Sequence, residues 1–221
     1  MVDSCLRDED YRQRADCCQN PEIRLLYVGY LREGKGLDDL IAALALLCQA
    51  GRHIRLDLIG SGEKEPALAA QAAVAGVAEH VRFRGYVPMG PALNACYDEA
   101  DIFVLPSLSE GSPRVVLEAL GHSLPVVATD VGNIAEQLGG GRRGVLIPRR
   151  NPPALAAGIA RLLDEPDFRR RCIAEGYQFA RAHSLGAFVA QIARRATEMV
   201  RARANPATPT AIDRLPADKT N

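Results

Sequence analysis

Two glutamates stand eight residues apart in the stretch S-E-G-S-P-R-V-V-L-E-A-L, which runs from Ser109 to Leu120. Glu110 lies in a turn-forming run of Gly, Ser and Pro, whereas Glu118 lies in an otherwise apolar run that is typical of a buried helix. A buried carboxylate costs on the order of several kcal/mol unless it is paired. A carboxylate only accepts hydrogen bonds, so Glu118 suits a ligand with two neighbouring hydroxyls, such as a ribose. The spacing alone gives equal support to an alternative, in which Glu118 pairs with a core arginine and Glu110 is solvated.

The residues between the two glutamates predict the start of a helix. Ser112 followed by Pro113 is a good N-cap and first-turn pair. The first N–H groups of this helix, near Arg114 and Val115, are then free of intrahelical acceptors. Together with the helix dipole they form an anion site suited to a phosphate.

A second candidate loop, G-Y-L-R-E-G-K-G, spans Gly29 to Gly36. Its glycines allow close approach to a ligand, and Lys35 or Arg32 can neutralise a phosphate. It is not a Walker A loop, because that motif needs Ser or Thr where Gly36 stands. Taken alone, a lysine in a glycine turn is more often part of a helix start. The G-S-G of residues 60–62 lacks the third glycine and the later acidic residue of a dinucleotide fingerprint, which argues against NAD.

These loops follow short apolar runs that alternate with helical patterns. The expected strands are Ile23–Gly29, His53–Gly60, Val81–Gly85, Asp101–Ser107, Leu124–Asp130 and Gly144–Pro148. Such alternation predicts an α/β, Rossmann-like, doubly wound domain with a mainly parallel six-stranded sheet and helices on both faces. Ligands of such sheets bind beyond the carboxyl ends of the strands. The loops to search are therefore 29–36, 60–63, 85–90, 106–113 and 130–133.

The domain is expected to span residues 22–203. Residues 1–21 are polar and charge-dense and predict a linker or a disordered start, and residues 204–221 predict a disordered tail. The last helical segment carries an apolar stripe, for which packing on the core or on another domain is the first expectation. Peripheral contact with a membrane surface is a minor alternative.

Composition excludes several function classes. Lys plus Arg and Asp plus Glu number 27 each, so the formal net charge is zero and no nucleic-acid partner is expected. The arginine clusters at 142–143, 149–150 and 169–171 are therefore interpreted as solvated faces. The first residues are too polar for a signal peptide, and no run is long enough to span a membrane. Six cysteines without a C-x-x-C pair indicate reduced thiols, a cytoplasmic location and no metal site.

The order of these motifs resembles the C-terminal half of group 1 (family 4, retaining) glycosyltransferases, which have the GT-B fold. The likeness rests on L-L-Y-V-G-Y-L-R-E-G-K-G, D-L-I-G-S-G, V-R-F-R-G-Y-V and A-D-I-F-V-L-P-S-L-S-E-G-S-P-R-V-V-L-E-A-L-G, then on L-P-V-V-A-T-D-V-G-N-I-A-E and G-V-L-I-P. It covers roughly residues 22–200. The paired glutamates are similar to the E-x7-E motif of that family.

The resemblance implies a role for each site residue. Glu110 would hold hydroxyls of a donor sugar and act with Lys35 in catalysis, and Glu118 would hold the ribose. The remaining donor-binding residues that it implies are Gly29, Arg32, Gly85, Tyr86, Val87, Gly111, Ser112, Pro113, Arg114 and Val115. The substrate would be a nucleotide sugar such as a UDP- or GDP-sugar, used without a cofactor and usually without a metal ion.

Two departures from the family pattern qualify this expectation. Tyr30 stands where the family often has an arginine, so Arg32 or Arg114 would have to supply that charge. The acceptor-binding N-terminal half is absent from the 221 residues. The expected function is glycosyl transfer with retention to a glycan or lipid-linked acceptor, in envelope glycan synthesis, in the cytoplasm or at the inner face of the membrane. The alternative is a non-catalytic donor-binding module, or a split subunit that needs a separate N-terminal partner.

Overall fold

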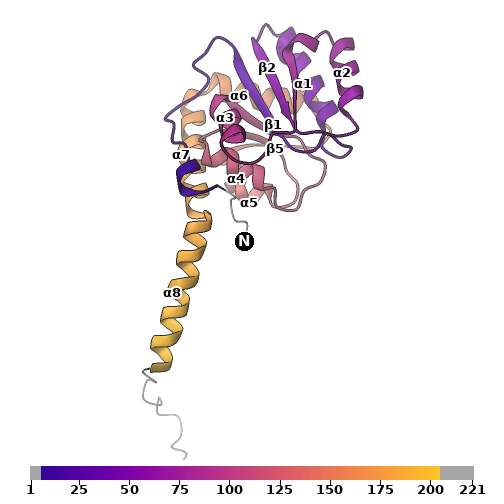
Figure 1. Ribbon diagram of the computed structural model, residues 1–221. Coiled ribbons are helices and arrows are strands. Elements are labelled where there is room, and N and C mark those ends of the chain that lie inside the picture. Colours follow the sequence, from indigo (N-terminus) through magenta and orange to yellow (C-terminus); the bar gives the residue numbers. More distant parts are fainter. Residues whose placement is uncertain (1–5, 205–221) are drawn as a thin grey trace, which may run out of the picture.

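The computed structural model describes residues 6–204. Its centre is a six-stranded sheet in the order β3-β2-β1-β4-β5-β6, with every neighbouring pair parallel. This is the Rossmann strand order. The predicted fold class, including the six strands, is confirmed (Figure 1).

The elements lie close to the predicted ranges. The strands are β1 Ile23–Val28, β2 Ile54–Ile59, β3 Val81–Gly85, β4 Ile102–Leu105, β5 Val126–Thr129 and β6 Gly144–Ile147. The α-helices are α1 Leu37–Gln49, α2 Glu65–Val74, α3 Pro91–Glu99, α4 Arg114–Gly121, α5 Ile134–Gln137, α6 Pro152–Asp164, α7 Pro166–Ala182 and α8 Leu185–Ala204. Short 3-10 turns are η1 Asp8–Asp10, η2 Ala78–His80 and η3 Gly139–Gly141.

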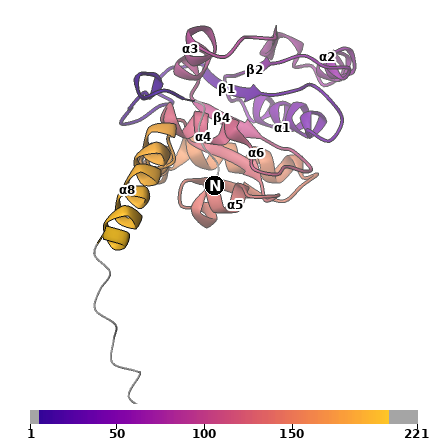
Figure 2. The same cartoon turned by 60° about the horizontal axis from the view of Figure 1, so that its bottom comes forward.

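Three of the inner strands, β2, β4 and β5, are buried along their whole length, which explains their largely apolar sequences. All residues of β2, β4 and β5 are buried, because helices cover both faces of the sheet. Helix α1 packs against α6, and α4 packs against α7. Figure 2 shows the sheet lying between helices. The ends of the strands are thus the places left open for a ligand.

The strand order reverses its direction between β1 and β4, and the site is expected at this point. From β1 the chain steps outward to β2 and β3, then returns to β4 on the other side of β1. The loops that follow β1 and β4 leave the sheet side by side, and they carry Lys35 and Glu110 respectively. In open α/β sheets such a switch point is where ligands bind.

The N-terminal segment corrects one prediction. Residues 6–21, expected as part of a linker or a disordered start, pack on the domain instead. Leu6 and Cys17 are buried. The Arg14 guanidinium donates hydrogen bonds to carbonyls at the ends of α3 and α4, and Asp16 forms an ion pair with Arg169. Arg169 is itself buried, so it does not belong to the solvated face expected for its cluster. Residues 1–5 lie outside the described part of the chain.

Helix α8 extends away from the body of the domain (Figure 1). Its apolar stripe is unpacked where the structure describes the side chains, because Val189, Ile192 and Met199 are more than half exposed. Of the two packings expected for this stripe, the one on the core is wrong within residues 6–204, and the one on another domain stays a prediction. None of the helices described is long and apolar enough to cross a membrane. Of the predicted disordered tail, residues 205–221 lie outside the described residues.

Candidate active site at the sheet edge

The loops after β1 and β4 are joined directly, and this brings the predicted catalytic pair together. The N–H of Leu108 donates to the carbonyl of Gly34 at 2.8 Å. Gly36 has φ +65°, and a Cβ there would lie 2.0 Å from the carbonyl oxygen of Pro106. Lys35 Nζ then reaches Glu110 Oε1 at 2.7 Å, with the two side chains only 16% and 13% exposed. Glu110 is thus ion-paired and largely shielded, not solvated.

The loop after β5 supports Glu110 from the opposite side. The N–H of Asn133 donates to the carbonyl of Gly111 at 2.8 Å. Gly132 has φ +56°, and a Cβ there would lie 2.1 Å from the Glu110 carbonyl oxygen. Only glycine fits such a contact. Three loops from β1, β4 and β5 therefore hold the backbone of Glu110 in one place.

Helix α4 begins one residue later than the predicted cap implies. Its first residue is Arg114, its N-cap is Pro113, and no side chain caps it. The prediction that Ser112 is the N-cap is therefore wrong, because the Ser112 hydroxyl instead lies 3.4 Å from Asn133 Nδ2 as a hydrogen-bond acceptor. The first-turn N–H groups of a helix have no intrahelical acceptor. The uncapped end of α4 thus keeps the character of an anion site.

Glu118 lies one turn further along α4 and is buried, with 7% of its surface exposed. Its Oε2 accepts a hydrogen bond of 2.9 Å from the Tyr97 hydroxyl. No described residue forms a salt bridge with Glu118, so the alternative of a core arginine partner is wrong. Burial raises the pKa of Glu118, while the hydrogen bond from Tyr97 and the charge of Arg114 act in the opposite direction.

A cavity of about 380 Å³ opens at the sheet edge beside Glu118. Of the predicted site residues, five line this sheet-edge cavity: Gly29, Tyr86, Val87, Val115 and Glu118. Tyr30, Gly60, Ser61, Met89 and Leu93 also line it. Tyr30, Tyr86 and Met89 are each at least two-thirds exposed, which leaves aromatic and thioether surface at the mouth of the cavity.

The other predicted residues lie outside the lining of the sheet-edge cavity. They are Arg32, Lys35, Gly85, Glu110, Gly111, Ser112, Pro113 and Arg114. The structure therefore divides the predicted site into two parts. One is an apolar cavity with a single carboxylate, and the other is the polar Lys35–Glu110 loop at the switch point.

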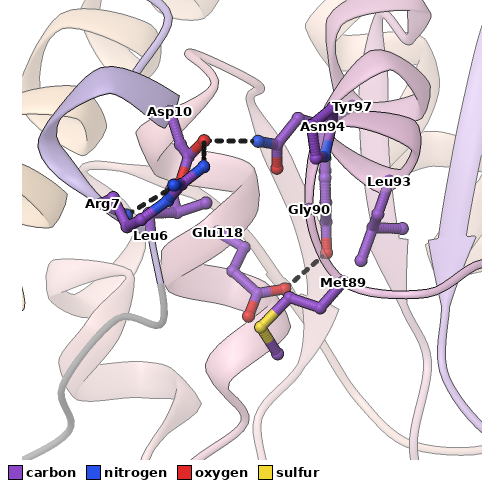
Figure 3. A pocket seen from close by; sticks show the side chains of 10 residues that line it. Leu6, Arg7, Asp10, Met89, Gly90, Leu93, Asn94, Tyr97 and Glu118 are labelled. Atoms are coloured by element: carbon purple, nitrogen blue, oxygen red, sulfur yellow. Dashed lines mark hydrogen bonds and ion pairs between the residues drawn. The ribbon is translucent and has the colours of Figure 1, made fainter.

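A second cavity, also of about 380 Å³, shares Met89, Leu93 and Glu118 with the first (Figure 3). It is formed between the N-terminal segment and α3, with Arg7, Asp10 and Asn94 among its lining residues. Asp10 accepts hydrogen bonds from the backbone N–H of Arg7 at 2.9 Å and from Asn94 Nδ2 at 2.8 Å. Its polar groups are thus already paired with one another.

Sequence reasoning missed the residue that contacts Glu118. Tyr97 lies at an apolar position of α3 and is fully packed, so its pattern is that of an ordinary core residue. The available signal was its hydroxyl, because a buried tyrosine usually has a hydrogen-bond partner. Gly60 was also discounted, yet a Cβ there would lie 1.9 Å from the Gly29 carbonyl oxygen. Among residues 6–204, no group of three or more His, Cys, Asp and Glu side chains could hold a metal ion.

Comparison with known proteins supplies the family. The family model described as Glycosyl transferases group 1 matches residues 14–179. D-inositol 3-phosphate glycosyltransferase of Thermomonospora curvata is 36% identical over 166 residues, which cover 71% of this chain and 38% of that protein. This chain therefore spans well under half the length of that curated relative.

Solved structures agree on the fold. The Anabaena protein Alr3699/HepE, solved in complex with UDP, superposes with a TM-score of 0.71 at 22% identity, over 80% of this chain and 49% of that one. The C-terminal domain of the Francisella tularensis group 1 glycosyltransferase LpcC superposes with a TM-score of 0.69 at 19% identity, over 82% of this chain and 97% of that one. The fold is that of the C-terminal half of a GT-B glycosyltransferase. With a family model that matches most of its length, the chain belongs to the group 1 glycosyltransferases.

Proposed function

We propose that this chain binds a nucleotide-diphosphate sugar and takes part in glycosyl transfer with retention of anomeric configuration. The observation that carries the proposal is Glu118, a buried carboxylate that lines a cavity at the carboxyl ends of β1 and β2 and forms no salt bridge with any residue from 6 to 204. A buried carboxylate that keeps only one hydrogen bond is costly, and such groups are concentrated at functional sites.

The sheet-edge cavity fits a nucleoside. Its volume of about 380 Å³ is within the range of small-molecule sites. Glu118 would accept hydrogen bonds from the ribose hydroxyls, and the exposed ring of Tyr86 and the neighbouring Val87 would contact the base. The Anabaena structure was solved with UDP bound, which supports a nucleotide ligand for this fold.

The diphosphate would lie between the cavity and the Lys35–Glu110 loop. The uncapped first turn of α4 and the backbone from Gly111 to Val115 offer N–H groups and a favourable helix dipole. Arg32 lies with its guanidinium carbon 5.9 Å from the centroid of the Tyr30 ring, at the rim of the cavity. This position supports Arg32 as the cation that replaces the arginine expected at position 30.

The transfer step would break the bond between the anomeric carbon of the sugar and the oxygen of the diphosphate. The nucleoside diphosphate leaves, the acceptor hydroxyl oxygen bonds to the anomeric carbon on the same face, and the hydroxyl proton passes to the departing diphosphate oxygen. Lys35 and the end of α4 would stabilise the charge on the leaving group. Glu110, already paired to Lys35 at 2.7 Å, would orient the sugar through its hydroxyls. No cofactor is required for this step.

Several finer predictions stay proposals. The acceptor would be a glycan or a lipid-linked glycan, bound by the acceptor-binding half of the fold or by a separate N-terminal partner. Envelope glycan synthesis and a cytoplasmic location at the inner membrane face also remain predictions. A donor-binding module without catalysis of its own is the competing proposal, and it shares the same nucleotide site.

The test is calorimetric titration of the chain with UDP, GDP and their sugars, repeated on Glu118→Ala. We expect one nucleotide to bind the wild-type chain, and the variant to lose about tenfold or more in affinity, because two hydrogen bonds to a charged acceptor are removed. Glu79→Ala, which removes an exposed glutamate at η2, is the matched control and should bind as wild type does. Equal affinity of wild type and Glu118→Ala would remove the ribose role of Glu118.

A further inference from the structure

Tyr97 holds the one buried carboxylate that lines the sheet-edge cavity, and its own ring is fixed by two aromatic contacts. The ring is 1% exposed and packs at 5.9 Å against Phe103 of β4. It stacks on the imidazole of His122 at 5.1 Å between centroids, with an interplanar angle of 12°. Only the hydroxyl leaves this apolar shell, and it reaches Glu118 Oε2 at 2.9 Å (Figure 3).

The hydrogen bond gives the two oxygens of Glu118 different tasks. Oε2 is occupied by Tyr97. Oε1 has no hydrogen-bond partner among residues 6–204, and Glu118 lines both cavities. A glutamate side chain has three rotatable bonds and loses rotamer freedom when a ligand binds. Because the hydrogen bond from Tyr97 already restricts the Glu118 side chain in the folded chain, less side-chain entropy is lost when a ligand binds.

The positions of α3 and α4 are tied together behind this hydrogen bond. Arg14 of the N-terminal segment donates to the carbonyls of Ala100 at 2.9 Å and of His122 at 2.9 Å. Ala100 directly follows α3, and His122 directly follows α4. One guanidinium therefore sets the distance between the helix that carries Tyr97 and the helix that carries Glu118.

The imidazole of His122 is part of the same support. Its Nδ1 lies 2.8 Å from Asp98 Oδ1, while its Nε2 is buried and without a hydrogen-bond partner among the described residues. Nδ1 then donates to Asp98, and the ring stays neutral, since burial lowers the pKa of His122. The neutral imidazole of His122 stacks on the Tyr97 ring and does not compete with Glu118 for the hydrogen bond from the Tyr97 hydroxyl.

We propose that Tyr97 is a positioning residue for nucleotide binding, which presents the Glu118 carboxylate to the ribose by holding its second oxygen. The inference rests on the proposed function, because it assumes that Glu118 accepts hydrogen bonds from a ribose. Tyr97 itself does not contact the nucleotide. It acts through Glu118, so its effect must disappear when Glu118 is removed.

The experiment is a double-mutant cycle on nucleotide affinity. Tyr97→Phe, Glu118→Ala and the double variant are titrated with UDP and GDP and with their 2′-deoxy forms, in parallel with the wild-type chain. Tyr11→Phe is the matched control, because it deletes a tyrosine hydroxyl that donates to the Ala180 carbonyl at 3.2 Å, away from the cavity. We expect Tyr97→Phe to lose about three- to tenfold in affinity and part of the preference for ribose over deoxyribose. In the Glu118→Ala background the same change should have no further effect.

Two results would overturn the inference while leaving the proposed function intact. One is a Tyr97→Phe variant that binds like Tyr11→Phe, and the other is an equal loss with and without Glu118. If the wild-type chain and Glu118→Ala bind equally, or neither binds, the proposed function fails and the inference fails with it.

A folding defect in Tyr97→Phe is separated by a further variant. Incorporation of 3-fluorotyrosine at position 97 keeps the ring and makes its hydroxyl a stronger donor. Affinity at or above that of the wild-type chain is expected. A loss of affinity there, in a folded chain, would contradict a role for hydrogen-bond donation.

Discussion

Glu110 and Glu118 belong to one motif, yet the structure gives them opposite surroundings. Glu110 lies in a loop fixed by glycine contacts and pairs with the ammonium group of Lys35 at 2.7 Å. Glu118 lies inside a helix and is held by the neutral hydroxyl of Tyr97 at 2.9 Å. One carboxylate forms an ion pair with a cation, whereas the other is held by a neutral hydroxyl and is influenced by the charge of Arg114 without a salt bridge.

The difference explains why the two residues suit different parts of one ligand. A carboxylate next to a lysine lies where charge changes during a reaction, beside a leaving diphosphate. A carboxylate held by a hydroxyl in an apolar cavity keeps a free oxygen for neutral hydroxyl groups. The first turns of α4 thus connect Glu110, which would lie beside the reacting group, with Glu118, which would recognise the ribose.

The largest expected effect comes from breaking the loop that carries Lys35 to Glu110. Gly36→Ala forces a side chain into positive φ and against the Pro106 carbonyl, so we expect a loss of about 3 to 4 kcal/mol in the free energy of unfolding. Gly34→Ala, with φ +84° and open space around it, should cost only about 1 kcal/mol. Urea unfolding of both variants measures the difference, and equal losses would contradict the close contact.

Breaking the support of Glu118 comes next. Arg14→Ala removes guanidinium hydrogen bonds to the carbonyls of Ala100 and His122, and we expect a loss of about 3 kcal/mol. Arg12→Ala, an exposed arginine two residues earlier, is the control and should stay within about 0.5 kcal/mol of wild type. If both variants unfold at the same urea concentration, the N-terminal segment does not tie α3 to α4.

A smaller loss of stability is expected when the ion pair between Glu110 and Lys35 is removed and the glycine contacts of the loop are left unchanged. Glu110→Ala leaves Lys35 partly buried and without its carboxylate, at an expected cost of about 2 kcal/mol in unfolding free energy. Adding Lys35→Met should restore part of that loss, because both charged partners are then gone. Losses that simply add in the double variant would show that the pair is not coupled.

The smallest expected effect is a gain in stability, whereas the preceding three are losses. Burial raises the pKa of Glu118, so ionisation of this carboxyl costs more free energy in the folded state than in the unfolded chain. The contribution of Glu118 to the free energy of unfolding is therefore fully present below the pKa of this carboxyl in the unfolded chain. It is lost as the pH rises through the pKa in the folded state. Glu118→Gln should therefore melt at a higher temperature than wild type near neutral pH, and the gap should close below about pH 4. A variant that is less stable than wild type at neutral pH would contradict this environment.

The strands and the switch point could be predicted from the sequence because both depend on local patterns. Unbroken apolar runs such as that of β4 identified the sheet, and glycine-rich runs after them identified the loops. Both glutamates and Lys35 were selected on these grounds. The structure adds that Lys35 and Glu110 contact each other, which their separation in sequence did not reveal.

What sequence reasoning missed depends on partners far away in the chain. Arg14 and Asp16 look like polar linker residues until their partners at the ends of α3 and α4 and on α7 are known. Tyr97 has the pattern of a core residue, and only its hydroxyl contact with Glu118 sets it apart. The helix start failed for a smaller reason, because the Ser112 side chain lies toward Asn133 and not toward the end of α4.

The central claim is that the two glutamates serve different parts of one nucleotide sugar. The most direct measurement is the affinity of UDP and GDP, without a sugar, for Glu110→Gln and Glu118→Gln by calorimetry. We expect Glu118→Gln to lose about tenfold in affinity for the nucleotide that wild type binds, while Glu110→Gln stays within about twofold. An equal loss in both variants, or a loss in Glu110→Gln alone, would contradict it.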